Sequence, residues 1–136
     1  METVRTIYSG GLRTKALHIR SGKELITDAP VDNQGLGEAF SPTDLVATAL
    51  GSCMLTIMGI AADNFNFNIE GTEVIITKIM ADKPRRIGHI KVELKFPPNN
   101  YSDKEKQIIE RIARQCPVAL SLHPDIHQEL IFHYSS

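Results

Sequence analysis

The stretch Leu45–Ala62, LVATALGSCMLTIMGIAA, decides the fold of this chain. It holds 18 residues without a charged side chain, which is about the shortest length that can span a membrane as a helix. Asp44 and Asp63 flank it, and it lacks the Trp and Tyr belt that anchors a spanning helix at the membrane surface. Because the stretch is also rich in small residues, it is only modestly apolar for a spanning helix. We therefore predict the central core helix of a soluble protein, not a membrane span.

Local signals predict where this helix begins and ends. Ser41 is a good N-cap, Pro42 suits the first helical position, and Asp44 stands where a capping box places an acid. The helix should end near Asp63, because residues 64–68, NFNFN, form a poor helix sequence. Since the helix is apolar around its whole circumference, we expect a central core helix. A chain of 136 residues is too small to enclose it fully, so we expect an obligate dimer.

The rest of the chain is predicted to form strands and one further helix. A second helix should start at Ser102, with Glu105 completing a capping box, and it should break or restart at Pro117. Residues 89–96 alternate polar and apolar side chains, as a half-buried strand does. Strands are expected over residues 3–9, 12–20, 23–29, 73–80, 89–96 and 126–134. The element order β-β-β-α-β-β-α-β predicts a single α+β domain over residues 1–136.

Composition narrows the function classes. The 136 residues carry a net charge of −1 and include no Trp. We therefore expect neither a nucleic acid nor an anionic membrane as a partner, because both attract basic surfaces and single strands also need aromatic side chains for stacking. Residues 1–5 show neither the apolar core nor the cleavage site of a signal peptide. We expect a cytoplasmic protein whose two cysteines are reduced at rest.

Cys53 and Cys116 are the best candidates for chemistry, because each is expected on an apolar helix face. Taken singly, each could be a small core hydrophobe, which is a common role of free cysteine. Together they suit a peroxidatic and resolving pair, in which one thiolate attacks a peroxide and the second thiol condenses with the resulting sulfenic acid. Such a pair needs neither a metal nor a cofactor. A zinc site of Cys116, His123 and His127 is a weaker alternative, because Pro124 spoils the helical spacing of the histidines.

A peroxidatic thiol needs a cation beside it. An ordinary thiol, with a pKa of about 8.5, is only a few per cent ionised at pH 7. The dipole of the helix contributes little, because its effect fades beyond the first turn and Cys53 lies well past it. Arg13 is a candidate, because a guanidinium never loses its charge. The alternative for Arg13 is a solvated strand residue.

Two motifs resemble the OsmC and organic hydroperoxide resistance (Ohr) family. Residues 37–45, GEAFSPTDL, followed by Ala47 and by residues 49–53, ALGSC, look like the helix signature of that family. Residues 116–118, CPV, resemble its second cysteine motif, which also follows a charged helix. Residues 28–30, DAP, resemble the more divergent OsmC-like branch. The resemblance covers nearly the whole chain in its order of elements.

This resemblance implies an OsmC-like fold, an intertwined homodimer in which the two helices carrying Cys53 are buried centrally and the sheets wrap around them. It implies an oxidoreductase of the oxidative stress response, an antioxidant peroxidase that reduces organic hydroperoxides to alcohols with a dithiol as reductant. By position, Cys53 would be the peroxidatic cysteine, Cys116 the resolving cysteine and Arg13 the activating arginine.

One position departs from the family pattern. Well-studied peroxidases of the family have Pro-Glu where this chain has Pro42-Thr43, and that glutamate holds the arginine. Thr43 can form a hydrogen bond but cannot balance a guanidinium charge, and Asp44 lies about 100° further around the helix. Glu38 could hold the arginine from the loop. The alternative function is a non-peroxidase OsmC-like protein that binds a small apolar or thiol-bearing ligand at the dimer interface.

Overall fold

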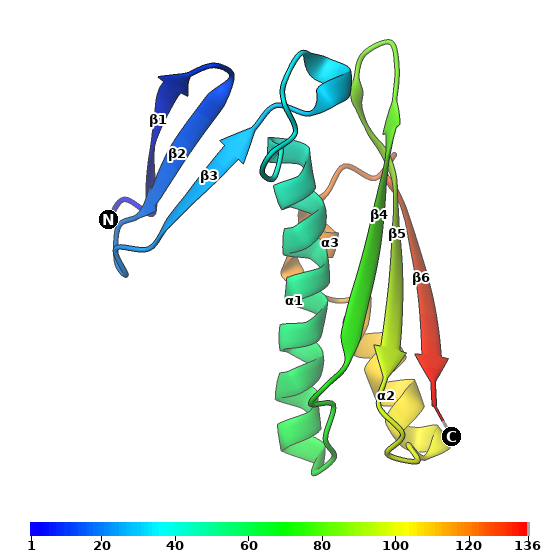
Figure 1. Ribbon diagram of the computed structural model, residues 1–136. Helices are drawn as coiled ribbons and strands as arrows, with labels where there is room; N and C mark the ends of the chain where they lie inside the picture. Colours follow the sequence, from blue (N-terminus) through cyan, green and yellow to red (C-terminus); the bar gives the residue numbers. More distant parts are fainter. Residues whose placement is uncertain (136) are drawn as a thin grey trace. The chain divides into compact units, whose positions relative to one another are not determined.

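The computed structural model of the protein describes residues 1–135 (Figure 1). The mixed content of helices and sheets confirms the predicted α+β class. The residues form two compact units, the first up to Val46 and the second from Ala47 onward, and each is described by itself. In chain order the described elements are β1 Val4–Gly10, β2 Arg13–His18, β3 Glu24–Asp28, η1 Val31–Asn33, α1 Pro42–Phe65, β4 Glu73–Ala81, β5 Arg86–Phe96, α2 Asp103–Ala113, α3 Pro117–Ser121 and β6 His127–Tyr134. The short helices η1 and α3 are additions to the predicted order.

The first unit contains a three-stranded antiparallel sheet in the order β1-β2-β3. The turn between β1 and β2 passes through Gly10, Gly11 and Leu12, whose φ angles are 86°, 63° and 63°. Glycine enters this left-handed region at no steric cost, so the Gly-Gly pair favours the turn. In the pairing of β2 with β3, Arg13 lies directly opposite Asp28. The register of this sheet therefore places a cation beside a carboxylate.

The loop after β3 folds back against the end of that strand. The Gly37 N–H donates a hydrogen bond to the Ala29 carbonyl oxygen at 3.1 Å. Gly35 is required here, because a Cβ on it would lie 1.8 Å from the same oxygen. The backbone N–H of Glu38 then donates to Asp28 Oδ2 at 3.0 Å. This close packing of loop and strand brings the Glu38 side chain to the region of Asp28.

The second unit contains the sheet β4-β5-β6, in which β5 is the central strand, antiparallel to β4 and parallel to β6. The apolar side chains of β5 alternate as predicted, and they are the buried ones. Figure 1 shows α1 running along this sheet. The core joins the strand residues Ile90, Val92, Leu94 and Phe96 to Leu50, Met54 and Met58 of α1 and to Ile109 and Ala113 of α2. The polar side chains of β5 therefore point away from this core.

α1 packs one side on the sheet and leaves other sides open. Gly51 lies against β4, where a Cβ would come within 2.4 Å of the Ile76 side chain, so this small residue permits close packing. Ser52, Thr56 and Ile60 are exposed, and Ile60 keeps 56% of its surface. The single chain therefore does not enclose this helix fully, as the small size of the chain predicted. When a helix is apolar on every side, its sequence does not indicate which side packs against other elements of the same chain.

α1 is long and apolar enough to cross a membrane, by length and composition alone, so the prediction that this stretch is only modestly apolar is wrong. The mean hydropathy of its most apolar segment is 2.0, and 39% of that segment is buried within the chain. Core helices of soluble proteins meet the same criteria. Leu50, Met54 and Met58 are completely buried in the core of the second unit. This packing is typical of a core helix.

Both predicted helix caps are present. The Ser41 N–H donates to Asp44 Oδ2 at 3.0 Å, and the Asp44 N–H donates to Ser41 Oγ at 3.1 Å. Ser102 and Glu105 form the same reciprocal pair at the start of α2. α1 ends slightly later than predicted, where Asn66 adopts a left-handed φ of 60°. Asparagine tolerates this conformation and is a common residue at the end of a helix.

Candidate functional site

The two cysteines lie next to each other in the second unit. Cys53 is midway along α1 and partly exposed, whereas Cys116 is the N-cap of α3 and is fully buried. Both are free thiols. The Cys53 side chain packs against the core cluster that contains Cys116, and its sulfur is near enough to raise the pKa of the Cys116 thiol. The structure thus brings together the two residues that the sequence indicated as a reactive pair.

Pro117 explains how Cys116 reaches this position. α2 ends at Ala113, and the chain resumes helical geometry as α3 from Pro117. Proline is favoured at the first position of a helix, because its missing N–H would have no partner there. Cys116 becomes the N-cap, and its Sγ accepts a hydrogen bond from the Ala119 N–H at 3.3 Å. The Cys-Pro sequence therefore holds this sulfur at a defined point of the core.

The two cysteines differ in burial, because Cys116 is fully buried and Cys53 is partly exposed. Burial raises the pKa of the Cys116 thiol, the Ala119 N–H opposes this, and the neighbouring Cys53 sulfur raises the pKa further. Cys116 is therefore protonated at neutral pH, and a protonated thiol is a poor nucleophile. Cys53 is the residue of the pair that is partly exposed to solvent. This arrangement suits a first reaction at Cys53 and a second at Cys116.

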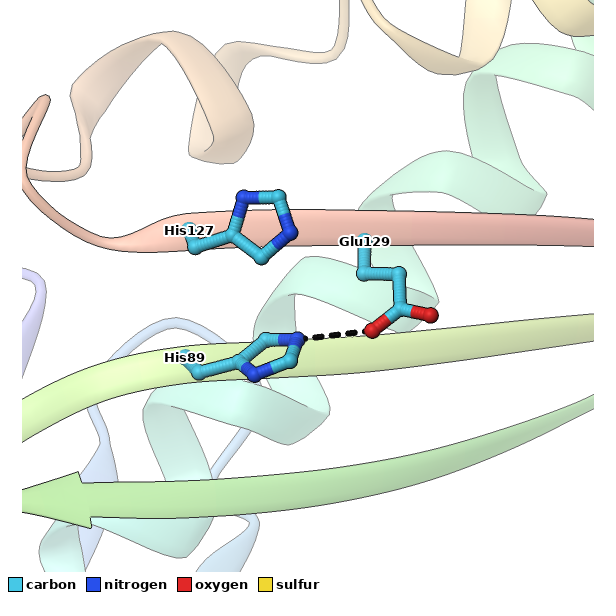
Figure 2. Close-up of side chains that lie close together, drawn as sticks. All are labelled: His89, His127 and Glu129. Carbon is cyan, nitrogen blue, oxygen red and sulfur yellow. Dashed lines mark hydrogen bonds and ion pairs between the residues drawn. The ribbon is translucent and has the colours of Figure 1, made fainter.

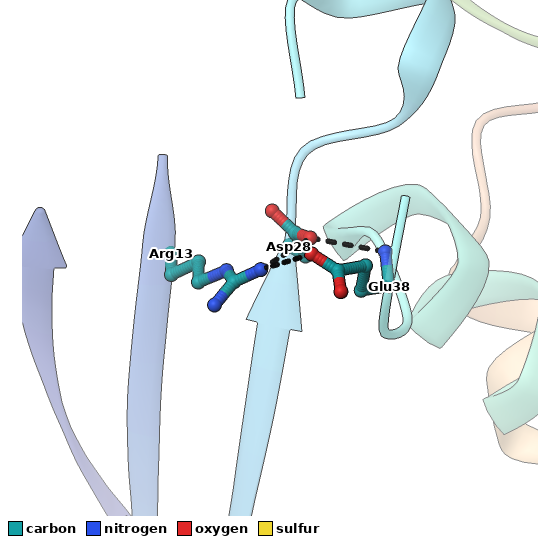
Figure 3. Close-up of polar contacts among 3 residues, drawn as sticks. All are labelled: Arg13, Asp28 and Glu38. Carbon is teal, nitrogen blue, oxygen red and sulfur yellow. Dashed lines mark hydrogen bonds and ion pairs between the residues drawn. The ribbon is translucent and has the colours of Figure 1, made fainter. Parts of the chain in front are cut away.

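Arg13, Asp28 and Glu38 form a charged cluster in the first unit (Figure 3). Arg13 Nη2 lies 2.7 Å from Glu38 Oε1 and 3.5 Å from Asp28 Oδ2. The side chains of Arg13 and Glu38 are 40% and 63% exposed, whereas that of Asp28 is 1% exposed. Glu38, named from the sequence as a possible holder of the arginine, thus contacts it directly from the loop.

Asp28 is the member of this cluster that sequence reasoning missed. The Glu38 backbone N–H is the main cause that lowers the pKa of Asp28, burial opposes it, and the Arg13 guanidinium adds to the lowering. The other carboxylate oxygen, Oδ1, has no hydrogen-bond partner among the described residues. Asp28 is therefore a buried, ionised carboxylate 3.5 Å from the Arg13 guanidinium. The motif at residues 28–30 contained this acid, but its pairing with Arg13 depends on strand register.

Thr43 and Asp44, the other two candidates for supporting the arginine, lie in the first turn of α1. Thr43 Oγ1 is 3.2 Å from Ser41 Oγ, and the Asp44 carboxylate completes the helix cap with the Ser41 N–H. Asp44 thus has a structural task at the helix start. The arginine cluster belongs to the first unit and the cysteine pair to the second.

The zinc set considered from the sequence is not assembled. Cys116 contacts the other cysteine, and His123 Nδ1 accepts a backbone hydrogen bond at 3.0 Å from the residue two positions on. His127 lies instead beside His89, with 4.7 Å between the ring centroids. Within residues 1–135, the potential metal ligands found within 4.8 Å of one another are those of His89, His127 and Glu129 (Figure 2). Sequence reasoning missed this group, because it depends on strand pairing.

Comparison with known protein families identifies a family that matches most of the chain. The family described as OsmC-like protein matches residues 35–130 of the chain. This range includes the helix with Cys53, the second cysteine motif and most of the sheet of the second unit. No curated protein sequence matches the chain.

Solved structures share the fold over nearly the whole chain. A protein from Psychrobacter arcticus 273-4, whose name refers to osmotic stress and a detoxification response, is 52% identical, with a TM-score of 0.94 over 98% of this chain and 96% of that one. The organic hydroperoxide resistance protein OsmC from Legionella pneumophila is 14% identical, with a TM-score of 0.77 over 98% of each chain. The organic hydroperoxide resistance protein OhrB of Bacillus subtilis is 15% identical, with a TM-score of 0.71 over 96% and 98%. Because the sequence identities are so low, the last two comparisons show a shared fold and nothing more.

Proposed function

Because this chain belongs to the OsmC-like protein family, we propose that it is a thiol-dependent peroxidase that reduces organic hydroperoxides to alcohols. The observation that carries the proposal is the thiol pair, in which a partly exposed Cys53 adjoins a buried and protonated Cys116. Two proteins of similar fold are named for organic hydroperoxide resistance, which supports the same chemistry.

In the first step, the Cys53 thiolate attacks one oxygen of the hydroperoxide. A sulfur–oxygen bond forms and the oxygen–oxygen bond breaks, so two electrons pass from sulfur to the peroxide. The products are a sulfenic acid on Cys53 and an alkoxide, which takes up one proton and leaves as the alcohol. Cys116 remains a thiol during this step, because it is buried and protonated.

In the second step, the Cys116 sulfur attacks the sulfenic sulfur of Cys53. A disulfide forms, and the sulfenic hydroxyl leaves as water together with the thiol proton of Cys116. The contact between the two thiols supports this step, since the partners are already adjacent. An external dithiol then reduces the disulfide by thiol–disulfide exchange and is itself oxidised to a disulfide.

Arg13 is proposed as the cation that favours the Cys53 thiolate, an assignment that rests on the family resemblance. The guanidinium is oriented by Glu38 at 2.7 Å and by Asp28 at 3.5 Å. In this proposal, Glu38 takes the role of the carboxylate that family peroxidases carry at the position of Thr43. The contact supports the assignment of Arg13, because a carboxylate other than residue 43 binds its guanidinium.

We propose further that the protein acts as a homodimer in the cytoplasm. Apolar side chains remain exposed on the single chain, among them Ile60 of α1 at 56% and Ile7 and Tyr8 of β1 at 72% and 64%. Exposed apolar surface of this extent is typical of an interface. A second copy of the chain in the intertwined arrangement of the family would cover it.

Rapid mixing of the purified protein with cumene hydroperoxide and a dithiol tests the proposed activity. We expect faster consumption of cumene hydroperoxide than of hydrogen peroxide. Cys53→Ser should abolish turnover, and Cys116→Ser should leave a single oxidation with a sulfenic acid on Cys53 that dimedone traps. Peroxide turnover that survives Cys53→Ser would contradict the proposal, as would an unmodified protein that consumes neither peroxide.

A further inference from the structure

His89, His127 and Glu129 meet on the face of the sheet that points away from the core (Figure 2). His89 of β5 and His127 of β6 are partners in the parallel register, and Glu129 follows two positions after His127 on the same face. His89 Nε2 lies 2.9 Å from Glu129 Oε1. We propose that these three side chains bind a divalent transition metal ion of the zinc type.

The donor set decides the class of metal. Two imidazoles and one carboxylate form a set that zinc accepts, with a water molecule in the fourth position. Magnesium and calcium ions prefer oxygen ligands alone, so they match this set poorly. The three ligand atoms lie within 4.8 Å of one another, whereas ligands around tetrahedral zinc are about 3.3 Å apart when the bonds are about 2.0 Å long. We expect rotation about the side-chain bonds to close this difference when an ion binds.

Access and support are both adequate for an ion from solution. The side chains of His89 and Glu129 are 28% and 39% exposed, and His127 is exposed. Behind them, Ile90 and Val92 of β5 are completely buried, so the strand that carries His89 is fixed by the core. Ligands on packed strands are held more rigidly than ligands on loops.

A neighbouring positive charge is expected to lower the affinity of the cluster for a metal ion. In the strand register, Ile79 of β4 lies beside His89, and Lys91 of β5 lies beside Glu129. The Lys91 ammonium repels a nearby cation, so Lys91→Gln should tighten metal binding. The cysteine pair packs with the core on the opposite side of the sheet, so this site is separate from the thiol chemistry.

Binding of Zn²⁺ and Co²⁺ by the full chain, after removal of bound metal with a chelator, tests the site. Thiols also bind these ions, so the reference protein carries Cys53→Ser and Cys116→Ser. Calorimetry should show one zinc ion per chain. Co²⁺ should give the visible bands of a nitrogen and oxygen site without the ultraviolet band of a thiolate ligand. Mg²⁺ should not compete.

Single substitutions in this reference protein assign the ligands. His89→Ala and His127→Ala should each weaken Zn²⁺ binding by about tenfold or more, and Glu129→Gln should weaken it as well. His133→Ala is the matched control, because His133 lies on the same face of β6, 3.7 Å from Glu93, and its loss should leave the affinity unchanged. In the unsubstituted reference, the imidazole NMR signals of His89 and His127 should shift on addition of Zn²⁺, while those of His133 should not.

Two results would overturn the proposal. The first is Zn²⁺ binding that stays equally tight after His89→Ala and after His127→Ala. The second is a reference protein that binds neither Zn²⁺ nor Co²⁺ and whose imidazole signals do not respond. In either case, His89 and Glu129 form a surface ion pair and nothing more.

Discussion

Glu38 lies in a loop and forms an ion pair with Arg13. Substitution of Glu38 by glutamine removes the charge of the side chain and keeps its size and shape. Glu38→Gln removes the carboxylate charge 2.7 Å from the guanidinium. It keeps the backbone N–H that donates to Asp28 at 3.0 Å, so the loop retains its attachment to β3. Asp28 remains as the other carboxylate near Arg13, at 3.5 Å. We therefore expect a folded protein whose arginine is less firmly oriented.

The stability of the protein should change little, and its activity should change more. The side chains of Arg13 and Glu38 are 40% and 63% exposed, and an ion pair so open to water stabilises a fold by about 0.2–1 kcal/mol. For a chain of 136 residues, a loss of 1 kcal/mol lowers Tm by roughly 3–5 °C. A small displacement of a group that acts in the reaction, such as the proposed activating Arg13, lowers the reaction rate more than it lowers stability. We expect kcat/KM for cumene hydroperoxide to fall roughly tenfold, which is about 1.4 kcal/mol of transition-state stabilisation.

A second substitution distinguishes positioning of the arginine from a general loss of charge. Thr43→Glu places an acid where family peroxidases carry one, in the first turn of a helix, where acids are favourable. It should restore much of the activity that Glu38→Gln removes, and should add little to the unmodified chain. The assay records Tm, kcat, KM and the alkylation rate of Cys53 across pH for each variant. Glu24→Gln is the matched control, because it breaks an exposed ion pair with Lys15 at 3.0 Å and should leave kcat/KM unchanged.

The reasoning is refuted if Glu38→Gln leaves both kcat/KM and the pH profile of Cys53 alkylation unchanged. Glu38 would then be an ordinary surface ion-pair residue. If Thr43→Glu also lowered Tm and left peroxide turnover negligible, the pocket would be burying an unpaired carboxylate. That pair of results would favour the OsmC-like protein that binds a small ligand without reducing peroxides.

Thiol reactivity, assembly and acid stability give the remaining expected outcomes. Alkylation near neutral pH should label Cys53 before Cys116, because Cys116 is buried and burial raises its pKa; faster labelling of Cys116 would reverse the proposed roles. Arg13→Met should slow alkylation of Cys53 at pH 7 by about tenfold, as expected for the loss of a nearby cation, and an unchanged rate would assign the activation to another cation. Sedimentation at low micromolar concentration should show a dimer, and a stable folded monomer would rule out the intertwined architecture. The pKa of Asp28 is lowered in the folded state from an ordinary value of 3.8, so its contribution to stability is complete above that pH and is lost as the pH falls through the folded value. Denaturant unfolding of Asp28→Asn below about pH 4 should therefore show a shallower pH dependence than the unmodified protein, and identical slopes would contradict this assignment.

The parts of the fold that depend on neighbouring residues can be predicted from the sequence. A capping box needs side chains only three positions apart, so Ser41 with Asp44 and Ser102 with Glu105 are recognisable without knowledge of the rest of the structure. The alternation along β5 has the same local origin, and its apolar members are the buried ones. Boundaries are harder to predict. β5 begins at Arg86, earlier than predicted, because its pairing with β4 continues past a bulge.

The contacts that build the candidate sites depend on pairings between distant residues. Arg13 meets Asp28 through the register of β2 with β3, and it meets Glu38 because the loop after β3 folds back. His89 meets His127 because β5 and β6 pair in parallel, and a slip of one residue would turn His127 to the other face of the sheet. Periodicity indicates the face of a strand on which a residue lies. It does not indicate the residue beside it on the next strand.

The Cys-Pro step shows how one local feature sets the order of the two proposed reactions. Pro117 cannot continue α2, so the backbone is extended at Cys116, with φ −67° and ψ 142°, before α3 begins. This break places the Cys116 sulfur inside the core, beside Cys53, with the Ala119 N–H on it. Burial keeps Cys116 protonated and away from a bulky hydroperoxide, whereas Cys53 is partly exposed. The different burial of two chemically identical side chains therefore supports the proposed order, in which Cys53 is attacked first and Cys116 then condenses with it.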